Sequence, residues 1–145
     1  MILISHRGNL SGPNSAKQNS PKQIDKVLNL GYHCEIDLWK VGDFFYLGHD
    51  KPNYKIDFKF LKNNKNLWIH AKNLEALNSL PNDLRYFWHQ TDDYTLTSDN
   101  IIWTFPNKQV CENSVIVDKN KNWRSKNYKC LLFFKCSMAT SIDKV

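Results

Sequence analysis

Short runs of apolar, β-branched and aromatic residues recur along the chain, separated by polar segments. Each run is four to six residues long, which is the length of a typical β-strand. Several runs are apolar at consecutive positions, a pattern typical of strands covered on both faces, as in parallel sheets and barrels. The pattern predicts strands at Ile2–Ser5, Cys34–Trp39, Phe44–Leu47, Leu67–Ala71, Arg85–His89, Ile101–Phe105, Ser114–Val117 and Cys130–Phe134.

Helix signals separate some of these runs. The clearest signal predicts Ser20 as N-cap, Pro21 as the first helical residue, Gln23 as capping-box partner and Gly31 as the stop. A second helix is expected after Asn73, with Leu74, Leu77 and Leu80 on one face and Pro81 at its end. A shorter helix is expected within Ile56–Lys62. Beyond Leu84 the helix signals fade, and Thr91–Asn100 and Pro106–Asn113 have the composition of loops.

The alternation of strands and helices in the first half predicts βαβ units and a parallel sheet. Eight candidate strands favour a closed barrel, but a full (β/α)₈ barrel takes about 250 residues, and about 200 at the least. The chain has 145 residues, enough for one domain spanning 1–145. We therefore predict an α/β fold, a compact or truncated TIM-like (β/α) barrel in which several helices are missing.

Composition and charge limit the partners and the location that we expect for the protein. The formal net charge is +6, but the basic residues are scattered, and we do not expect a nucleic-acid partner. No stretch reaches the roughly 18–20 apolar residues of a membrane span, and the opening Met1–His6 is too short for a signal peptide. The cysteines form no C-x-x-C pair, so we expect free thiols in a cytoplasmic protein. The densest basic cluster, which we interpret as a solvated loop, comprises Lys119, Lys121, Arg124, Lys126 and Lys129.

Polar side chains that could carry chemistry stand at the carboxyl ends of predicted strands, where parallel α/β barrels place their active sites. His6 and Arg7 follow the first strand, and His49 follows Phe44–Leu47. Within Cys34–Trp39, Glu35 and Asp37 are two residues apart and therefore share a face of the strand. Two neighbouring carboxylates repel each other unless a proton or a cation neutralises them, and oxygen ligands of this kind suit Mg²⁺ or Ca²⁺.

The same spacing applies to the strand Leu67–Ala71. His70 and Lys72 face one way, opposite Ile69 and Ala71, and His89 ends the strand that follows. Histidine is the natural acid or base near neutral pH. The arrangement of histidines at several strand ends therefore favours a catalytic site over isolated structural histidines.

The motifs together resemble those of a known family. The order and spacing of four segments are similar to the HRG, ENT, E-x-D and HD motifs of the glycerophosphodiester phosphodiesterase family. These segments are His6-Arg7-Gly8, Gln18-Asn19-Ser20, Glu35-x-Asp37 and His49-Asp50. Weaker matches to the family's E-x-K and W-T strands extend the resemblance to about residue 107, at Ile69-His70-Ala71-Lys72 and Ile102-Trp103-Thr104. Residues 108–145 have no place on the family pattern.

The resemblance implies a TIM-like barrel that hydrolyses small phosphodiesters with a divalent metal, Mg²⁺, Ca²⁺ or Mn²⁺. His6 and His49 would then be the general acid and base, and Arg7 and Lys72 would contact the phosphate. His89 and Trp103 would complete the substrate pocket. The metal would be held by Glu35, Asp37 and His70.

Two positions depart from the family pattern. Gln18 replaces the glutamate of ENT, and His70 replaces the glutamate of E-x-K, where an imidazole favours Zn²⁺, Mn²⁺ or Fe²⁺ over Ca²⁺. These departures leave open the alternative of a catalytically impaired barrel that binds a phosphorylated sugar or lipid head group. A weaker alternative is a nucleic-acid-binding module, which would use the surplus of basic residues and the segment Lys119–Lys129.

Overall fold

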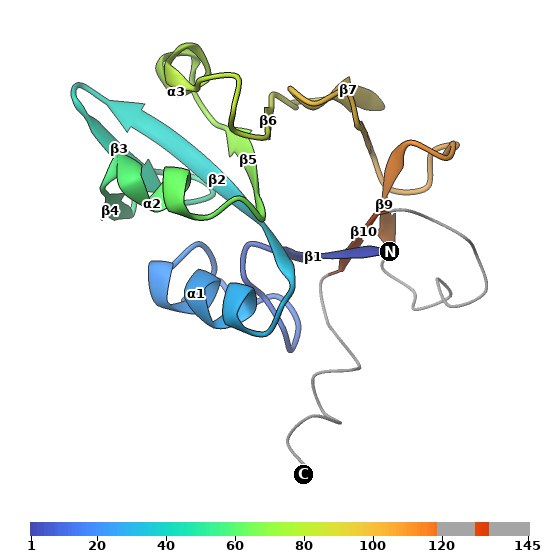
Figure 1. Ribbon diagram of the computed structural model, residues 1–145, viewed down its shortest axis with the longest axis horizontal. Coiled ribbons are helices and arrows are strands. Elements are labelled where there is room, and N and C mark those ends of the chain that lie inside the picture. The colour runs from blue at the N-terminus through green and yellow to red at the C-terminus, as the bar shows by residue number, and fades with distance from the viewer. Residues whose placement is uncertain (119–129, 134–145) are drawn as a thin grey trace, which may run out of the picture.

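A computed structural model describes residues 1–118 and 130–133 of the chain. The described residues form ten strands and three helices (Figure 1). The helices are α1 (Pro21–Asn29), α2 (Phe58–Asn63) and α3 (Leu74–Ser79). The strands are β1 (Ile2–His6), β2 (His33–Val41), β3 (Phe44–Leu47), β4 (Tyr54–Ile56), β5 (Leu67–Ala71), β6 (Tyr86–Phe87), β7 (Tyr94–Leu96), β8 (Ile102–Thr104), β9 (Ser114–Asp118) and β10 (Cys130–Phe133).

Parallel pairing runs through the middle of a mixed sheet. Seven strands pair side by side in parallel, in the spatial order β6, β5, β2, β1, β10, β9 and β8. The long strand β2 continues beyond this parallel region and pairs with β3 in an antiparallel hairpin, which β4 extends. At the other end of the sheet, β7 lies antiparallel to β8. The carboxyl ends of β1, β2 and β5 therefore meet at one edge of the sheet.

The predicted truncated TIM-like barrel is wrong. The protein is mostly β, with only three helices among the described residues, and it forms no closed barrel. Within 1–118 and 130–133, no strand ladder joins β6 to β8, so the bent sheet stays open. The reason lies in the connections after α3. The segment 91–100 forms β7 and turns instead of a helix that could complete a βαβ unit.

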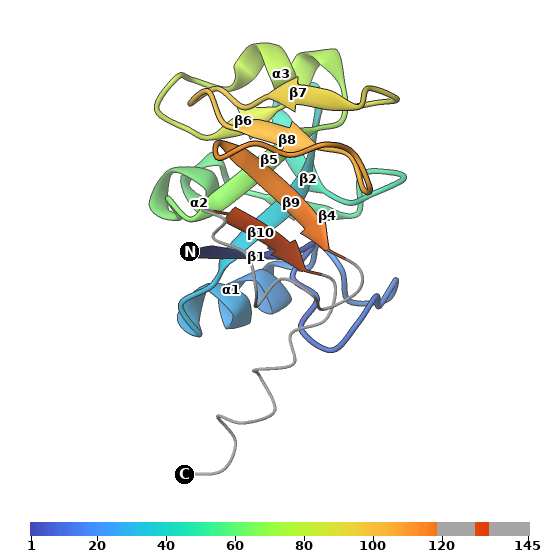
Figure 2. The ribbon, with the colours of Figure 1, turned by 90° about the vertical axis from the view of Figure 1, so that its right-hand side faces the viewer.

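Two cores pack against opposite faces of the sheet because side chains alternate along each strand. The outer core joins Cys34, Ile36 and Leu38 of β2 to the buried faces of the helices, including Ile24 of α1 and Leu61 of α2. Figure 2 shows α1 and α3 at opposite ends of the molecule with strands between them. The inner core lies within the bend of the sheet and contains Ile4, Trp68, Phe87, Trp103, Val115, Cys130 and Leu132.

The predicted strands all appear in the described residues; β3 and β5 have the predicted bounds, and the ends of the others are shifted by at most two positions. β4 and β7 were not predicted, and β7 falls where the sequence predicted a loop. The helix at Ser20–Gly31 is confirmed, but its capping box is wrong. The Gln23 amide donates to the Gly8 carbonyl at 3.0 Å instead of capping the helix. Leu74 was expected on one face of α3 with Leu77 and Leu80; it is 71% exposed, whereas Leu80 is 6% exposed.

Other expectations fall partly outside the described residues. Cys34, Cys111 and Cys130 are free, as expected, whereas Cys136 lies in a segment that is not described. Phe134 and the basic cluster Lys119–Lys129 also lie outside the described ranges. Among the described helices, none has the length and apolar character needed to cross a membrane.

The turn after β3 brings the chain next to Asp37. The Gly48 N–H donates to the Asp37 carbonyl at 3.1 Å, and the Gly48 carbonyl accepts from the Trp39 indole at 2.7 Å. A Cβ at Gly48 would overlap the backbone carbonyl oxygen of Lys51. Only glycine fits this position, and the turn fixes where His49 leaves the sheet.

We predict that Gly48→Ala lowers the free energy of unfolding by about 1–3 kcal/mol, because the backbone must move to admit the methyl group. Gly42→Ala is the matched control. Gly42 also has a positive φ, of +57°, but an added Cβ would meet nothing within 4 Å. We expect a loss of about 1 kcal/mol or less for this control. Urea denaturation measures both values, and equal losses would contradict the steric argument.

Candidate active site

The candidate site forms a layer of polar and aromatic side chains directly beyond the inner core. Residues i and i+2 of a strand share a face, so the residue two positions after an inner-core residue extends the same face towards the carboxyl edge. On four strands this step leads from Ile4, Trp68, Phe87 and Trp103 to His6, His70, His89 and Phe105. The packed core below holds this layer in place.

Glu35 and Asp37 occupy the same face of β2, as the sequence predicted. Their side chains are only 3% and 0% exposed, while Ile36 between them packs into the outer core on the opposite face. Two carboxylates buried side by side are unfavourable unless positive charge or protons compensate them. The contacts around the pair therefore decide what the site can do.

Asp37 is compensated from three directions. The Asn19 amide donates to Asp37 Oδ2 at 2.9 Å, and the Asp37 backbone N–H donates to Asn19 Oδ1 at 3.0 Å. Arg7 Nε lies 2.9 Å from Oδ2. On the other oxygen, Lys72 Nζ lies 3.5 Å and His70 Nδ1 lies 3.2 Å from Oδ1. The predicted sharing of one face by His70 and Lys72 is confirmed.

These contacts determine the ionisation of Asp37. Burial alone would raise the pKa of its carboxyl group, but the adjoining His70 ring and the charges of Arg7 and Lys72 hold that pKa well below its usual value. Asp37 is therefore a carboxylate over the whole physiological pH range.

Asn19 is a site residue that sequence reasoning missed. Its side chain is fully buried, and its backbone has a φ of +60°, which few residues except asparagine and glycine adopt readily. Arg7, on the neighbouring loop, also has a positive φ, of +55°, and its carbonyl accepts from the Asn19 N–H at 3.0 Å. The position of Asn19 within the ENT-like segment was the available signal.

His70 presents one ring nitrogen to the two carboxylates. Its Nε2 lies 2.9 Å from the His89 carbonyl oxygen, which can only accept, so Nε2 carries a proton. Nδ1 then lies 3.2 Å from Asp37 Oδ1 and 3.9 Å from Glu35 Oε1. Such close approach of ring nitrogen and carboxylate oxygens requires positive charge between them, either a proton on Nδ1 or a metal ion.

Glu35 differs from Asp37 in its ionisation. Burial and the negative charge of Asp37 raise the pKa of Glu35 to about 8. Its Oε2 accepts from the Arg7 backbone N–H at 3.2 Å and lies 3.9 Å from His6 Nε2. Near neutral pH the pair therefore holds one carboxylate and one largely protonated carboxyl group.

The two predicted catalytic histidines occupy different environments. Burial and the charge of Arg7 lower the pKa of His6 to about 3, with a further contribution from nearby His49. His6 is thus a neutral imidazole at pH 7. His49 is more exposed, and its Nδ1 lies 2.7 Å from Asp50 Oδ1. Among the described residues, Asp50 is the partner in its only ion pair, so His49 belongs to the rim of the site.

The predicted substrate-binding residues do not all lie at the candidate site. Arg7 and Lys72 lie at Asp37, as described above. His89 is half-buried, with its ring centroid 6.4 Å from that of His70. Trp103 is 6% exposed and stacks on Phe87 at 4.3 Å, which places it in the inner core one layer below the site. Its role as a substrate contact stays a prediction.

Glu35, Asp37 and His70 fit a divalent cation by their own geometry. Each offers one ligand atom, and these atoms all lie within 4.8 Å of one another. Asp37 Oδ1 is buried and faces His70 Nδ1 at 3.2 Å, so these two ligand atoms lie on the same side of the site. Two carboxylates and an imidazole suit Mn²⁺ or Zn²⁺ better than Ca²⁺.

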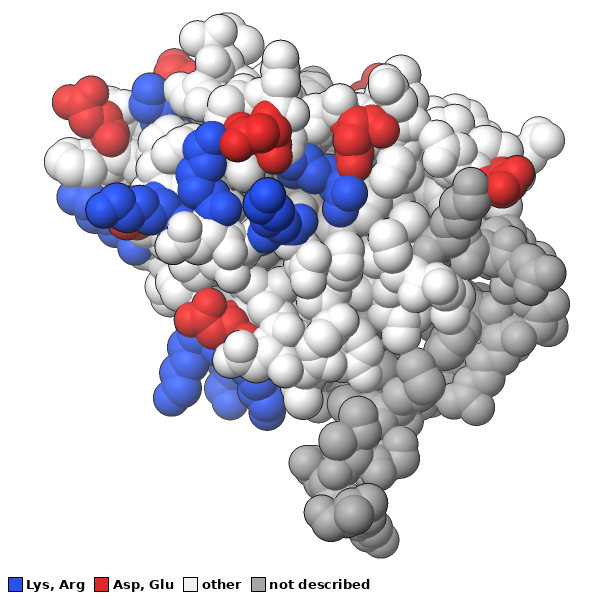
Figure 3. Space-filling view, in the orientation of Figure 1, with Lys and Arg blue, Asp and Glu red and all other residues white. Residues whose placement is uncertain are grey.

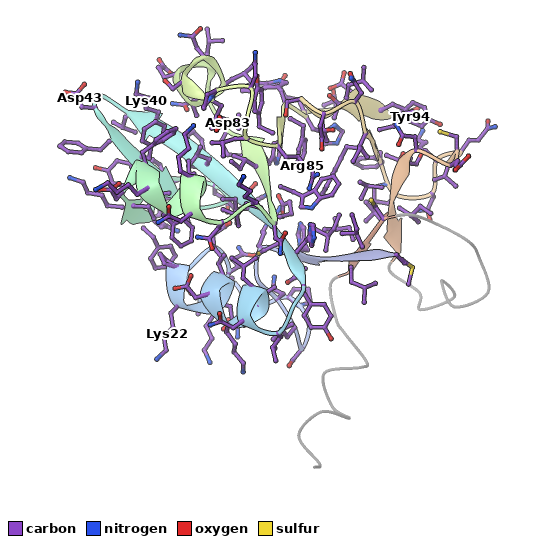
Figure 4. The ribbon with its side chains drawn as sticks, in the orientation of Figure 1. Lys22, Lys40, Asp43, Asp83, Arg85 and Tyr94 are labelled. Carbon is purple, nitrogen blue, oxygen red and sulfur yellow. The ribbon has the colours of Figure 1, made fainter. Side chains whose placement is uncertain are left out.

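A cavity elsewhere in the molecule does not coincide with this site. It measures about 490 Å³ and is lined mainly by residues of β7 to β9 and the loop before β9, including Tyr94, Leu96, Ile102 and Cys111. Of the described residues that line it, none is a predicted site residue. Figure 4 shows Tyr94 at the far end of the sheet from Lys40 and Asp43 of the β2–β3 hairpin.

Comparison of the chain with protein-family models, with curated proteins and with solved structures gives no match. A functional proposal for this chain therefore depends on the geometry of the candidate site.

The raised pKa of Glu35 has a consequence for stability. The folded protein keeps this proton up to about pH 8, whereas the unfolded chain loses it above about pH 4.5, so stability falls as pH rises between these values. His6 acts in the opposite direction below pH 6.5, since only the unfolded form binds its proton there. Above pH 6.5 the contribution of Glu35 remains.

We therefore predict that, with EDTA present, the free energy of unfolding decreases between pH 6.5 and 8 by about 1 kcal/mol per pH unit. Glu35→Gln, which cannot ionise, should remove this decrease. Urea denaturation at several pH values measures the slope. An unchanged slope in Glu35→Gln would show that Glu35 is already ionised at neutral pH in the folded protein.

Proposed function

We propose that the protein is a metal-dependent phosphodiester hydrolase that acts on small substrates of the glycerophosphodiester type. The observation that carries this proposal is the convergence of Glu35, Asp37 and His70 beside a neutral His6 and the cations Arg7 and Lys72. A cytoplasmic location accords with the free cysteines among the described residues.

A divalent metal bound by Glu35, Asp37 and His70 would polarise the phosphoryl oxygens and stabilise the negative charge that builds up in the transition state. The His89 carbonyl orients the His70 ring through Nε2, which keeps Nδ1 available as a ligand atom. Asn19 fixes the Asp37 carboxylate from the opposite side. The protein thus supplies both the ligands and the contacts that orient them.

The remaining residues would bind the phosphate and transfer the protons. Arg7 and Lys72 place two positive charges at Asp37, where they can also contact the oxygens of a bound phosphate. His6 is neutral at pH 7 and would accept a proton from the attacking water. His49, on the rim, would donate a proton to the leaving oxygen. Hydrolysis then yields a phosphomonoester and a free alcohol.

A second candidate is a protein that binds phosphate esters without turnover. The observation that favours it is the pair Arg7 and Lys72, two positive charges beside Asp37 that can receive a phosphate. A nucleic-acid interface has less support. On the face in Figure 3, Lys and Arg are interspersed with Asp and Glu, and Lys62 and Arg85 pair with Asp83 and Asp99.

Turnover of bis-p-nitrophenyl phosphate and of glycerophosphocholine tests the proposal. We expect hydrolysis in Mn²⁺, weaker hydrolysis in Ca²⁺, and none in EDTA. His6→Ala and His49→Ala should each reduce kcat by about 100-fold or more, the usual contribution of a general acid or base. The matched control is His33→Gln, which changes a histidine at the start of β2, away from the carboxyl edge.

The outcomes separate the two candidates. Absence of turnover in every metal, together with a higher melting temperature in the presence of a phosphate ester, would favour the binding protein. Full activity of His6→Ala would contradict its role as a base. Circular dichroism of each variant shows whether the fold persists.

A further inference from the structure

The site layer has two chemically distinct halves. At the carboxyl ends of β1, β2 and β5 it carries Asp37 and its charged partners, while just beyond the ends of β6 and β8 it carries the rings of His89 and Phe105. The rings continue directly from the candidate metal ligand. The centroids of His70 and His89 are 6.4 Å apart, and those of His89 and Phe105 are 5.9 Å apart. We call His89 and Phe105 the aromatic wall.

Phe105 is exposed where an inward-facing residue would be expected to be covered. It lies two residues after Trp103 and therefore continues the inner face of β8, yet its side chain is 46% exposed whereas Trp103 is 6% exposed. A large apolar side chain left open beside a polar site is typical of a ligand contact. The i+2 step from Trp103 was the available signal for this residue.

His89 adds a hydrogen-bonding group to the same wall. Its Nδ1 is buried and has no hydrogen-bond partner among the described residues. Burial and the nearby His70 lower the pKa of His89, so its ring is neutral at pH 7. A neutral imidazole can both stack on a flat ring and hydrogen-bond to a polar edge of that ring.

The two rings of the wall are inclined at 45° to each other. A flat ligand ring can therefore stack on one of them while its edge meets the other, the two arrangements that aromatic rings prefer. Glycerol has no flat face to use this surface. A nucleoside base has a flat face and hydrogen-bonding edges.

We infer that the preferred substrate is a phosphodiester with a nucleoside as one of its two alcohols. This inference rests on the proposed function. The phosphate lies at Arg7 and Lys72, and the base lies on His89 and Phe105. In hydrolysis the oxygen of water bonds to phosphorus, the bond from phosphorus to the other alcohol breaks, and that alcohol leaves with a proton. The products are a nucleoside monophosphate and the free alcohol.

Two methyl esters with the same leaving group test the inference. One is the methyl ester of uridine 5′-phosphate, and the other is the methyl ester of glycerol 3-phosphate; both release methanol. We expect kcat/KM to be about tenfold or more higher for the uridine ester, as one stacked base contributes about this factor. Phe105→Ala should remove the preference through a higher KM for the uridine ester, and Phe105→Trp should keep it.

Phe44→Ala is the matched control. Phe44 lies on the β2–β3 hairpin and is 50% exposed, so its removal changes a similar apolar surface away from the site. Its kcat/KM for both esters should equal that of the wild type. Equal rates for the two esters, unaffected by Phe105→Ala, would overturn the nucleoside assignment and leave the proposed hydrolase standing.

Absence of hydrolysis of every diester would overturn the proposed function. In that case, ligand binding to the aromatic wall can still be measured by titration calorimetry. Uridine 5′-phosphate should then bind about tenfold more tightly than glycerol 3-phosphate, and Phe105→Ala should equalise the two affinities. Equal affinities in the wild-type protein would overturn the inference independently of turnover.

Discussion

The structure of the site depends on the burial of one negative charge, that of Asp37. A carboxylate taken out of water is strongly destabilising unless ion pairs and hydrogen bonds replace its hydration. Here Arg7, Lys72, His70 and Asn19 supply that replacement, and they come from three separate segments of the chain. Asp37 therefore determines how the loop after β1, the segment before α1, and the end of β5 must meet.

The inner core explains how a small, open sheet can hold such a cluster. Below the site, Trp103 stacks on Phe87 and packs at a tilt against Trp68, and His70 stacks on Phe87 at 5.0 Å. Large aromatic side chains fill the bend of the sheet, although no ladder closes it in the described part of the chain. The site residues rest on this packing, one strand step further along.

Local patterns predicted much of the secondary structure, because apolar runs and capping residues act over a few positions. The strands β3 and β5 have the predicted bounds, and Asn73 caps α3 through its side chain, which accepts from the Ala76 N–H. Local patterns could not show whether the sheet closes into a barrel. Closure depends on whether distant strands pair, and the short polar segment that became β7 carries no periodicity that would reveal its partner.

The candidate site was predictable to the extent that it follows from strand alternation. The spacing of Glu35 and Asp37, and of His70 and Lys72, placed each pair on one face, and the structure brings both pairs together. Asn19 was missed because its role depends on a left-handed backbone conformation and a partner 18 residues away. Phe105 was missed because its exposure depends on the open side of the sheet.

We expect Glu35, Asp37 and His70 together to bind one divalent cation. Titration calorimetry with Mn²⁺ on the purified protein at pH 8 tests it most directly, with His70→Ala beside the wild type and His33→Gln as the control. The account predicts one Mn²⁺ per chain, bound at least about tenfold more weakly by His70→Ala and unchanged in His33→Gln. Absence of Mn²⁺ binding, or equal binding by His70→Ala, would contradict the account.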